Sequence, residues 1–301
     1  MRLGISTPAV TVYPPTASEW EPSAGIQDIA RIAVAADELG YHHLTCSEHV
    51  AVPADIAAVR GGTYWDPLAT LGYVAALTTR IRLATQVLVL GYHHPLEIAK
   101  RYGTLDAVSG GRLILGLGVG SLEQEFELLG APFADRGARA DDALAALRAS
   151  LSVSEPEYHG RFHDYSGFIV RPHAVQDRVP LWIGGRTRRS LRRALDHGDG
   201  WVPFGLSLPD MESMLAGVAE ARSSSSSSSS AFDVVLSPDR MLDPLGDPAA
   251  TARALEAVAR AGATITGVSI TARDASHYCD QLAELRELAA GEGHEFTSVD
   301  R

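Results

Sequence analysis

The 301-residue sequence is poor in cysteine and lysine and has no long apolar run. Its two cysteines, Cys46 and Cys279, give neither metal-ligand spacing nor a disulfide framework, so we expect a reducing compartment and a cytoplasmic protein. No apolar run reaches about 18 residues, and the N-terminus lacks the apolar segment of a signal peptide. A formal net charge of -11 repels nucleic acid and anionic membranes. The remaining expected partner is a small-molecule substrate.

Short apolar runs alternate along the chain with longer segments of helical periodicity. Several of these runs are almost continuously apolar, as in 87–90 and 113–115, which is typical of strands buried on both faces. The pattern predicts eight strands: Leu3–Ser6, His43–Ser47, Ile81–Leu90, Leu113–Gly118, Val179–Gly184, Gly200–Phe204, Phe232–Ser237 and Ile265–Ile270.

A helical segment follows each predicted strand. Four of these helices are placed at Asp66–Thr78, Ala138–Leu151, Arg188–Asp196 and Pro209–Ala221. Eight strand–helix units in a chain of this length predict an α/β fold, a closed (β/α)8 TIM barrel, as a single domain over residues 1–301. The rival is an open doubly wound sheet, which would want a glycine-rich turn after the first strand. That strand leads instead into a proline-rich extended loop.

Two insertions interrupt this regular alternation. One, over 119–137, comes after strand 4, and the other, over 154–178, comes before strand 5. Aromatic and polar residues alternate around Gly160, which predicts a small hairpin. The run Ser223–Ser230 is of low complexity and is interpreted as a flexible surface loop without a function.

Barrel enzymes carry their chemistry on the loops at the C-terminal ends of the strands. The second strand ends in Glu48-His49, a carboxylate and an imidazole that can act in acid–base catalysis or anchor a substrate. The alternative is that His49 only hydrogen-bonds the following loop. The pair His93-His94 resembles a metal site, but neighbouring residues cannot easily bind one ion. Because Pro95 suits a first helical turn, His94 is predicted at or beside a helix N-cap.

Glycines mark the ends of the fourth and fifth strands. Gly118-Val119-Gly120-Ser121 could let the backbone approach a flat ligand or a phosphate closely, although tight turns often show the same pattern. Gly184-Gly185-Arg186 precedes a helix N-terminus, where free N–H groups and the helix dipole favour an anion. For Arg192 and Arg193, farther along that helix, ion pairs with neighbouring carboxylates are the favoured interpretation.

The order and spacing of several segments resemble the luciferase-like monooxygenase superfamily. The resemblance covers about residues 1–205 and is closest to its branch that uses the deazaflavin coenzyme F420. The segments that carry it are Gly118-Val119-Gly120-Ser121-Leu122-Glu123-Gln124-Glu125-Phe126, Leu129-Gly130-Ala131-Pro132-Phe133, Arg136-Gly137-Ala138-Arg139, Tyr158-His159-Gly160-Arg161-Phe162, Arg171-Pro172, Pro180-Leu181-Trp182-Ile183-Gly184-Gly185 and Asp199-Gly200-Trp201.

The resemblance implies a role for each matching position. His49 would be an active-site residue, and a bulge or a non-proline cis peptide would fall at Gln86-Val87. The cofactor would be bound by Gln86, Val87, Gly118, Gly120, Ser121, Ile183, Gly184, Gly185 and Arg186. A homodimer is also expected. A sugar-phosphate substrate is not expected, because Lys100 is the only lysine.

The predicted function is hydride transfer between a small organic substrate and F420, with His49 as proton donor or acceptor and Glu48 as the group that orients it. The arginines in 186–189 favour this coenzyme, since they could receive its acidic tail, which FMN lacks. The alternative is an FMN-dependent monooxygenase that uses molecular oxygen. A barrel that binds a cofactor without catalysis and a metal-dependent hydrolase are further alternatives, and the last lacks a ligand set.

Overall fold

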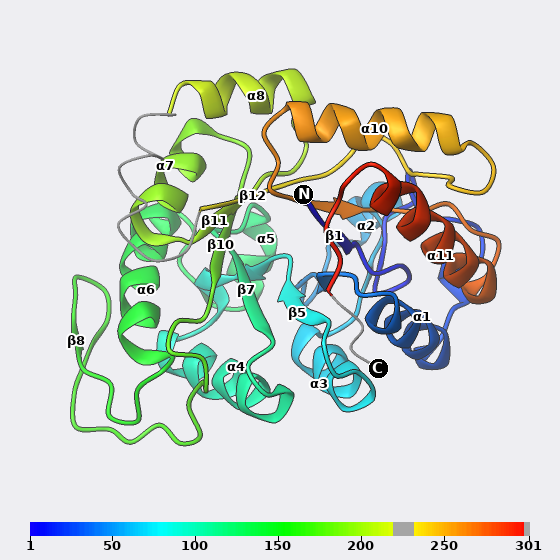
Figure 1. Cartoon of the computed structure of the whole chain (residues 1–301). Coiled ribbons are helices and arrows are strands. Elements are labelled where there is room, and N and C mark those ends of the chain that lie inside the picture. Colours follow the sequence, from blue (N-terminus) through cyan, green and yellow to red (C-terminus); the bar gives the residue numbers. More distant parts are fainter. Residues whose placement is uncertain (219–231, 298–301) are drawn as a thin grey trace.

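The computed structural model describes residues 1–218 and 232–297, and its centre is a closed parallel β-barrel (Figure 1). Eight strands follow one another around the ring in chain order, and the pairing of β10 with β7 closes it. The predicted TIM barrel is therefore confirmed. The strands are β1 (Arg2–Ile5), β3 (His43–Cys46), β5 (Arg82–Thr85), β7 (Leu113–Gly118), β10 (Leu181–Gly184), β11 (Gly200–Val202), β12 (Asp233–Leu236) and β13 (Ile265–Val268).

Helices surround the barrel and connect its strands (Figure 1). Several begin at a side-chain cap followed by proline: Asp66 accepts a hydrogen bond from the N–H of Ala69, and Asp247 from that of Ala250. None of the described helices combines the length and the apolar character needed to cross a bilayer. The helices around the barrel are α1 (Ile26–Glu38), α3 (Pro67–Leu77), α4 (Pro95–Ser109), α6 (Arg136–Ser150), α7 (Arg188–His197), α8 (Leu208–Ala216), α10 (Pro248–Arg260) and α11 (Ala275–Gly291).

Two predictions extend beyond the described residues. The end of the helix predicted over Pro209–Ala221 and the whole run Ser223–Ser230 lie outside them.

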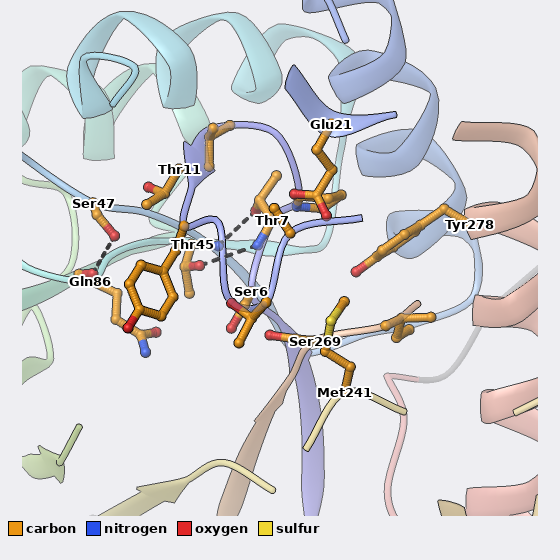
Figure 2. Close-up of a pocket in the computed structure, with 16 residues that line it drawn as sticks. Ser6, Thr7, Thr11, Glu21, Thr45, Ser47, Gln86, Met241, Ser269 and Tyr278 are labelled. Atoms are coloured by element: carbon orange, nitrogen blue, oxygen red, sulfur yellow. Dashed lines mark hydrogen bonds between the residues drawn. The ribbon is translucent and has the colours of Figure 1, made fainter. Parts of the chain in front are cut away.

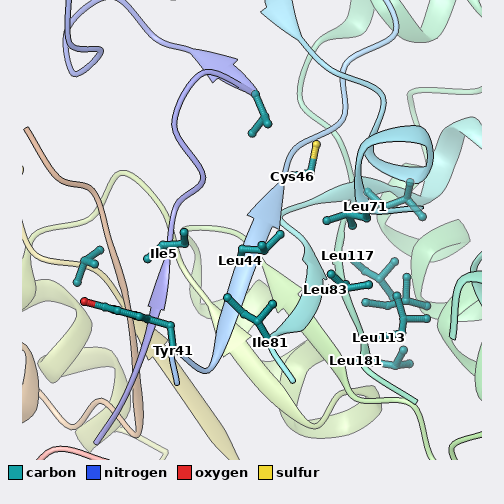
Figure 3. Close-up of a cluster of buried hydrophobic side chains, with 14 of the residues drawn as sticks. Ile5, Tyr41, Leu44, Cys46, Leu71, Ile81, Leu83, Leu113, Leu117 and Leu181 are labelled. Carbon is teal, nitrogen blue, oxygen red and sulfur yellow. The ribbon is translucent and has the colours of Figure 1, made fainter. Parts of the chain in front are cut away.

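The hydrophobic core has two parts, because successive residues of a strand face opposite sides of the barrel wall. The larger part lies between strands and helices and includes Leu44, Leu83 and Leu113 (Figure 3). The smaller part consists of Ala84, Ile114, Trp182, Val202, Val235 and Ile265. Ile114 alternates along β7 with Leu113 and Leu115 of the larger part, so this second cluster fills the barrel interior.

Polar groups accompany the inner cluster near the N-terminal ends of the strands. His43 is fully buried, and its ring occupies the space that a Cβ at Gly4 would need. The Trp182 indole N–H donates to Asp233, which also forms an ion pair with Arg2 at 2.7 Å. This end of the barrel is closed by side chains, which leaves the opposite mouth for a ligand.

The third predicted strand, Ile81–Leu90, is not continuous. It divides into β5 and β6 (Leu88–Val89), and the peptide bond between Gln86 and Val87 is cis. Here the chain bonds to the segment after β3: the N–H of Gln86 donates to the carbonyl of Cys46, and the N–H of Glu48 donates to that of Val87. The irregularity that the resemblance implied at this position is confirmed.

The insertions and the loops after β1 and β3 carry further short elements. The hairpin predicted around Gly160 is confirmed as β8 (Tyr158–His159) paired with β9 (Asp164–Tyr165). Insertion 119–137 contains a short helix that was not predicted, α5 (Glu123–Leu128). Other elements of these loops were not predicted either, among them β2 (Thr11–Val12), which pairs with β4 (Thr63–Tyr64), and α2 (Ala54–Arg60).

Candidate active site at the barrel mouth

His49 lies just beyond the C-terminal end of β3, in the loop that leads to α2. Its Nδ1 atom is 2.6 Å from a carboxylate oxygen of Glu125 in α5, and its ring contacts the ring of Tyr64 edge to face, with centroids 4.5 Å apart. Within the described residues, no hydrogen bond involves its Nε2. The contact with Glu125 favours the proton on Nδ1 and leaves Nε2 as the atom available to a substrate.

Glu125 is a buried carboxylate that accepts four hydrogen bonds. One oxygen accepts from the backbone N–H groups of Val50 and Ala51, at 2.6 and 3.1 Å. The other accepts from His49 at 2.6 Å and from the Tyr92 hydroxyl at 2.7 Å. Burial by itself would raise the pKa of Glu125, but these hydrogen bonds outweigh it and lower its pKa below the ordinary value. The carboxylate therefore remains ionised beside His49 at neutral pH.

Glu48 does not orient His49, so that prediction is wrong. Its two carboxylate oxygens accept from the backbone N–H of Val89 and from Nε2 of His93, both at 2.7 Å. Adjacent residues of an extended chain point in opposite directions, and Glu48 accordingly turns away from its neighbour. Burial would lower the pKa of His93, but Glu48 overcomes this effect and raises it.

His94 caps α4, as predicted. Its Nδ1 accepts from the backbone N–H of Leu96, and Pro95 occupies the first helical position. His93 and His94 therefore have separate structural partners.

Gly118 and Gly184 face the side chain of Val87, which packs against the inner cluster. A Cβ on Gly118 would come within 2.7 Å of one Val87 methyl group, and a Cβ on Gly184 within 2.8 Å of the other. The absence of side chains at these glycines thus accommodates Val87, which is partly exposed at the mouth. A ligand on this side would contact Val87, and the role of the two glycines as cofactor contacts stays a prediction.

Ile183 also requires a correction. Its side chain is 1% exposed and belongs to the core between strands and helices, where it would obstruct a Cβ at Gly198. It cannot reach a ligand at the mouth, because it points to the outer face of the barrel wall.

The loop after β7 turns at Gly120, whose φ of +77° favours glycine. A Cβ there would come within 2.5 Å of the Phe126 ring, and the Gly120 carbonyl accepts a hydrogen bond from Arg136. Ser121 follows in the same loop and is exposed. The loop thus packs against α5, the helix that carries Glu125.

The turn between β10 and α7 has the features of an anion site. Gly185 has a φ of +133°, and a Cβ on it would lie 2.6 Å from the Ser190 side chain. Thr187 caps α7 through reciprocal hydrogen bonds with Ser190. In the part of the chain that the structure describes, no acceptor is bonded to the backbone N–H of Gly185, Arg186 or Arg188. Free N–H groups at a helix N-terminus are suited to bind a phosphate.

The arginines of α7 divide into two groups. Arg193 is buried and forms an ion pair with Asp141, as predicted. The same prediction for Arg192 is wrong, since Arg192 is exposed and no ion pair joins it to a carboxylate of the described residues. Arg186, Arg188 and Arg189 are exposed, and none of them forms an ion pair with a carboxylate of residues 1–218 or 232–297. They place positive charge next to the free N–H groups on a protein that is otherwise acidic.

A cavity of about 190 Å³ opens on the other side of the mouth, under the loop that follows β1. Figure 2 shows residues from the ends of several strands around it, among them Ser6, Ser47, Gln86 and Ser269. Tyr278 of α11 borders it from the side opposite Gln86. Because Gln86 precedes Val87, the cavity adjoins the irregular segment of the third strand.

No sequence pattern indicated several of these partners. Glu125 is 76 residues from His49 in the chain, and Tyr278 reaches the cavity from the last described helix. Glu125 belongs to a segment that carried the family resemblance, but no local pattern indicated its contact with His49.

Comparison with known sequences places these observations in context. The family model described as luciferase-like monooxygenase matches residues 1–243. A Mycobacterium tuberculosis protein described as uncharacterized is 30% identical over 203 residues, which cover 64% of this chain and 70% of that protein. The 4-hydroxyprotoasukamycin monooxygenase of Streptomyces nodosus is 36% identical over 120 residues, 40% of this chain and 30% of that enzyme.

Solved structures with the same fold include proteins of two kinds. The monooxygenase RslO1 from Streptomyces bottropensis has a TM-score of 0.76 at 24% identity, covering 97% of this chain and all (100%) of its own. The coenzyme F420-dependent tetrahydromethanopterin reductase from Methanopyrus kandleri has a TM-score of 0.70 at 17% identity, covering 90% of this chain and 96% of its own. At these identities the likeness shows the fold alone.

Proposed function

The chain belongs to the luciferase-like monooxygenase family, and from this premise we propose that it is an oxidoreductase that uses coenzyme F420. In this proposal the coenzyme binds at the barrel mouth and exchanges a hydride with a small organic substrate. The free N–H groups of Gly185, Arg186 and Arg188 would hold its phosphate, and Val87 would lie against its ring. An F420-dependent reductase has the same barrel, so the fold is compatible with this coenzyme.

The observation that carries the proposal is the positive charge at the start of α7. Arg186, Arg188 and Arg189 are exposed and form no ion pair with a described carboxylate, while the whole chain has a net charge of -11. Such an isolated cationic turn suits a ligand with several negative charges. The acidic tail of F420 supplies these charges beyond the phosphate, whereas FMN ends at its phosphate.

A deazaflavin supplies hydride transfer and reacts poorly with oxygen, so the protein has to supply positioning and a proton route. His49 fits the second task. With Nδ1 donating to Glu125, neutral His49 accepts a proton at Nε2 when an alcohol or amine is oxidised. In the reverse reaction, the reduction of the substrate, the protonated imidazole donates the proton from Nε2.

The second candidate is an FMN-dependent monooxygenase. The observation that favours it is the 36% identity with a monooxygenase over 120 residues. The free N–H groups of the β10–α7 turn would serve the phosphate of FMN equally well, so only the arginines separate the two candidates.

Charge reversal tests the proposal directly. The double variant Arg186→Glu/Arg189→Glu should weaken F420 binding about tenfold or more at low salt and affect FMN much less, because only F420 extends its charge past the phosphate. Arg260→Glu on the outer helix α10, where Arg260 pairs with Glu256, is a matched control that should change neither affinity. An equal loss for both cofactors, or no loss for either, would contradict the proposal.

A further inference from the structure

The cavity under the β1 loop contains buried polar groups that have no partner within the described residues. They are the hydroxyl of Tyr278, the side-chain carbonyl of Gln86 and the hydroxyl of Thr11. Tyr278 as a whole is 1% exposed, and Figure 2 shows its hydroxyl directed toward the cavity. A buried polar group without a partner is costly, so each of these atoms is suited to a ligand that supplies the missing hydrogen bond.

The surrounding hydroxyls are held in place by other contacts. Thr7 and Thr45 each accept a backbone N–H of the other, and the Ser47 hydroxyl donates to the backbone carbonyl of Gln86 (Figure 2). These bonds fix the walls of the cavity before any ligand enters. The site is therefore preorganised, which reduces the entropy that binding has to offset.

The charge of the lining restricts the ligand. No lysine or arginine lines the cavity, and its one carboxylate, Glu21, is held by the backbone N–H groups of Ala9 and Ser18. An anion would thus lose its hydration without gaining a cation. A neutral group avoids this cost, and the carbonyl of Gln86 requires that it carry a hydrogen-bond donor.

The volume of the cavity indicates the size of that group. Cavities of about 150 Å³ accept benzene, so about 190 Å³ holds one six-membered ring with a substituent. The lining combines hydroxyls with the apolar side chains of Val10, Met241 and Ile270, which fits a ring that carries hydroxyl groups on a carbon framework.

We propose that this cavity is the substrate subsite and that it selects an uncharged, hydroxylated group about the size of a six-membered ring, with Tyr278 and Gln86 as its polar contacts. This inference rests on the proposed function in one respect: the reacting carbon of the substrate has to lie outside the cavity, on the side of Val87, where the coenzyme would bind.

Two probes of similar size and different charge test the subsite on the full chain without cofactor. Cyclohexanol should bind saturably in an NMR titration, and cyclohexanecarboxylate should bind at least tenfold more weakly. In Tyr278→Phe the affinity for cyclohexanol should fall roughly three- to tenfold, the effect of one lost neutral hydrogen bond. Equal or tighter binding of the carboxylate, or an unchanged affinity in the variant, would overturn the proposal.

Tyr41→Phe is the matched control. Tyr41 is equally buried, but its hydroxyl donates to the carbonyl of Leu282 at 2.8 Å. Its loss should lower the melting temperature and leave cyclohexanol binding unchanged, whereas Tyr278→Phe should not lower the melting temperature. A lower melting temperature in Tyr278→Phe with normal probe binding would show a structural role and refute the subsite.

An F420 titration of the same proteins separates the two proposals. If the coenzyme fails to bind while cyclohexanol binds through Tyr278, only the proposed function is wrong. If F420 binds equally to wild type and Tyr278→Phe while cyclohexanol does not bind, only the subsite is wrong.

Discussion

Replacing Glu125 by glutamine changes the proton position on His49 without changing the shape of the site. One oxygen of Glu125 accepts from the backbone N–H groups of Val50 and Ala51, which can only donate. The glutamine oxygen has to stay on these groups, so its NH₂ group faces His49 and Tyr92. Nδ1 of His49 must then accept a hydrogen bond, and its proton moves to Nε2, the atom that should receive the substrate proton.

The size of the effect follows from these contacts. General acid–base assistance is worth about 10²–10⁴ in rate, and kcat for oxidation should fall by that factor when Nε2 is blocked by its own proton. Stability should fall by about 1–3 kcal/mol, because a buried hydrogen bond between a carboxylate and His49 is replaced by a neutral one. The fall in kcat should thus be much larger than any fall in activity caused by a smaller fraction of folded protein.

Two measurements and one control variant examine this prediction. Nitrogen NMR shifts of the imidazole report the protonated atom, Nδ1 in wild type and Nε2 in Glu125→Gln, and need no substrate. Glu48→Gln is the control, since Glu48 is also buried at the mouth but contacts His93. An unchanged tautomer in Glu125→Gln, or an equal change in Glu48→Gln, would refute the reasoning. Full turnover in His49→Ala would refute the acid–base role itself.

Two further predictions concern the cofactor turn and the closed end of the barrel. Gly185→Ala should weaken cofactor binding at least about tenfold, because the added Cβ meets Ser190 and a φ of +133° is strained for alanine; Gly72→Ala, where a Cβ meets nothing within 4 Å, should leave the affinity unchanged. Burial and the nearby Arg2 and Arg82 lower the pKa of His43 from 6.5 to about 3. The unfolded chain therefore binds the proton first, so the contribution of His43 to the free energy of unfolding is fully present above pH 6.5 and should fall below it by about 1.4 kcal/mol per pH unit. Burial lowers the pKa of the neighbouring His42 to about 2, which adds a loss of the same sign. Urea unfolding at pH 7, 6 and 5 measures this, and a constant midpoint would contradict it.

Much of the barrel could be predicted from periodicity alone, for a physical reason. Parallel strands buried on both faces are continuously apolar, so runs such as Leu113–Gly118 are visible in the sequence. The helix starts were equally visible, since Asp66 and Pro67 form a local cap. The break within Ile81–Leu90 could not be seen this way, because single polar residues such as Gln86 also occur within unbroken strands. Only the family resemblance indicated it.

The site was less predictable because its contacts join distant segments. His49 was identified from its place at a strand end, but its partner Glu125 comes from an insertion whose helix has no strong pattern. Glu48 was assigned to His49 by adjacency, and the extended backbone separates them. Gly118 and Gly184 are still predicted as ligand contacts, but no sequence pattern indicated that their missing Cβ atoms accommodate Val87. The expected homodimer and cytoplasmic location stay predictions.

The choice of coenzyme is the central claim, and a fluorescence titration of the purified protein with F420 and, separately, with FMN tests it most directly. Three arginines at the start of α7, which form no ion pair with a carboxylate of the described residues, predict that F420 binds at least about tenfold more tightly at low salt and that added salt reduces this preference. Tighter binding of FMN, with oxygen consumed once the bound flavin is reduced, would contradict the account and establish the monooxygenase alternative.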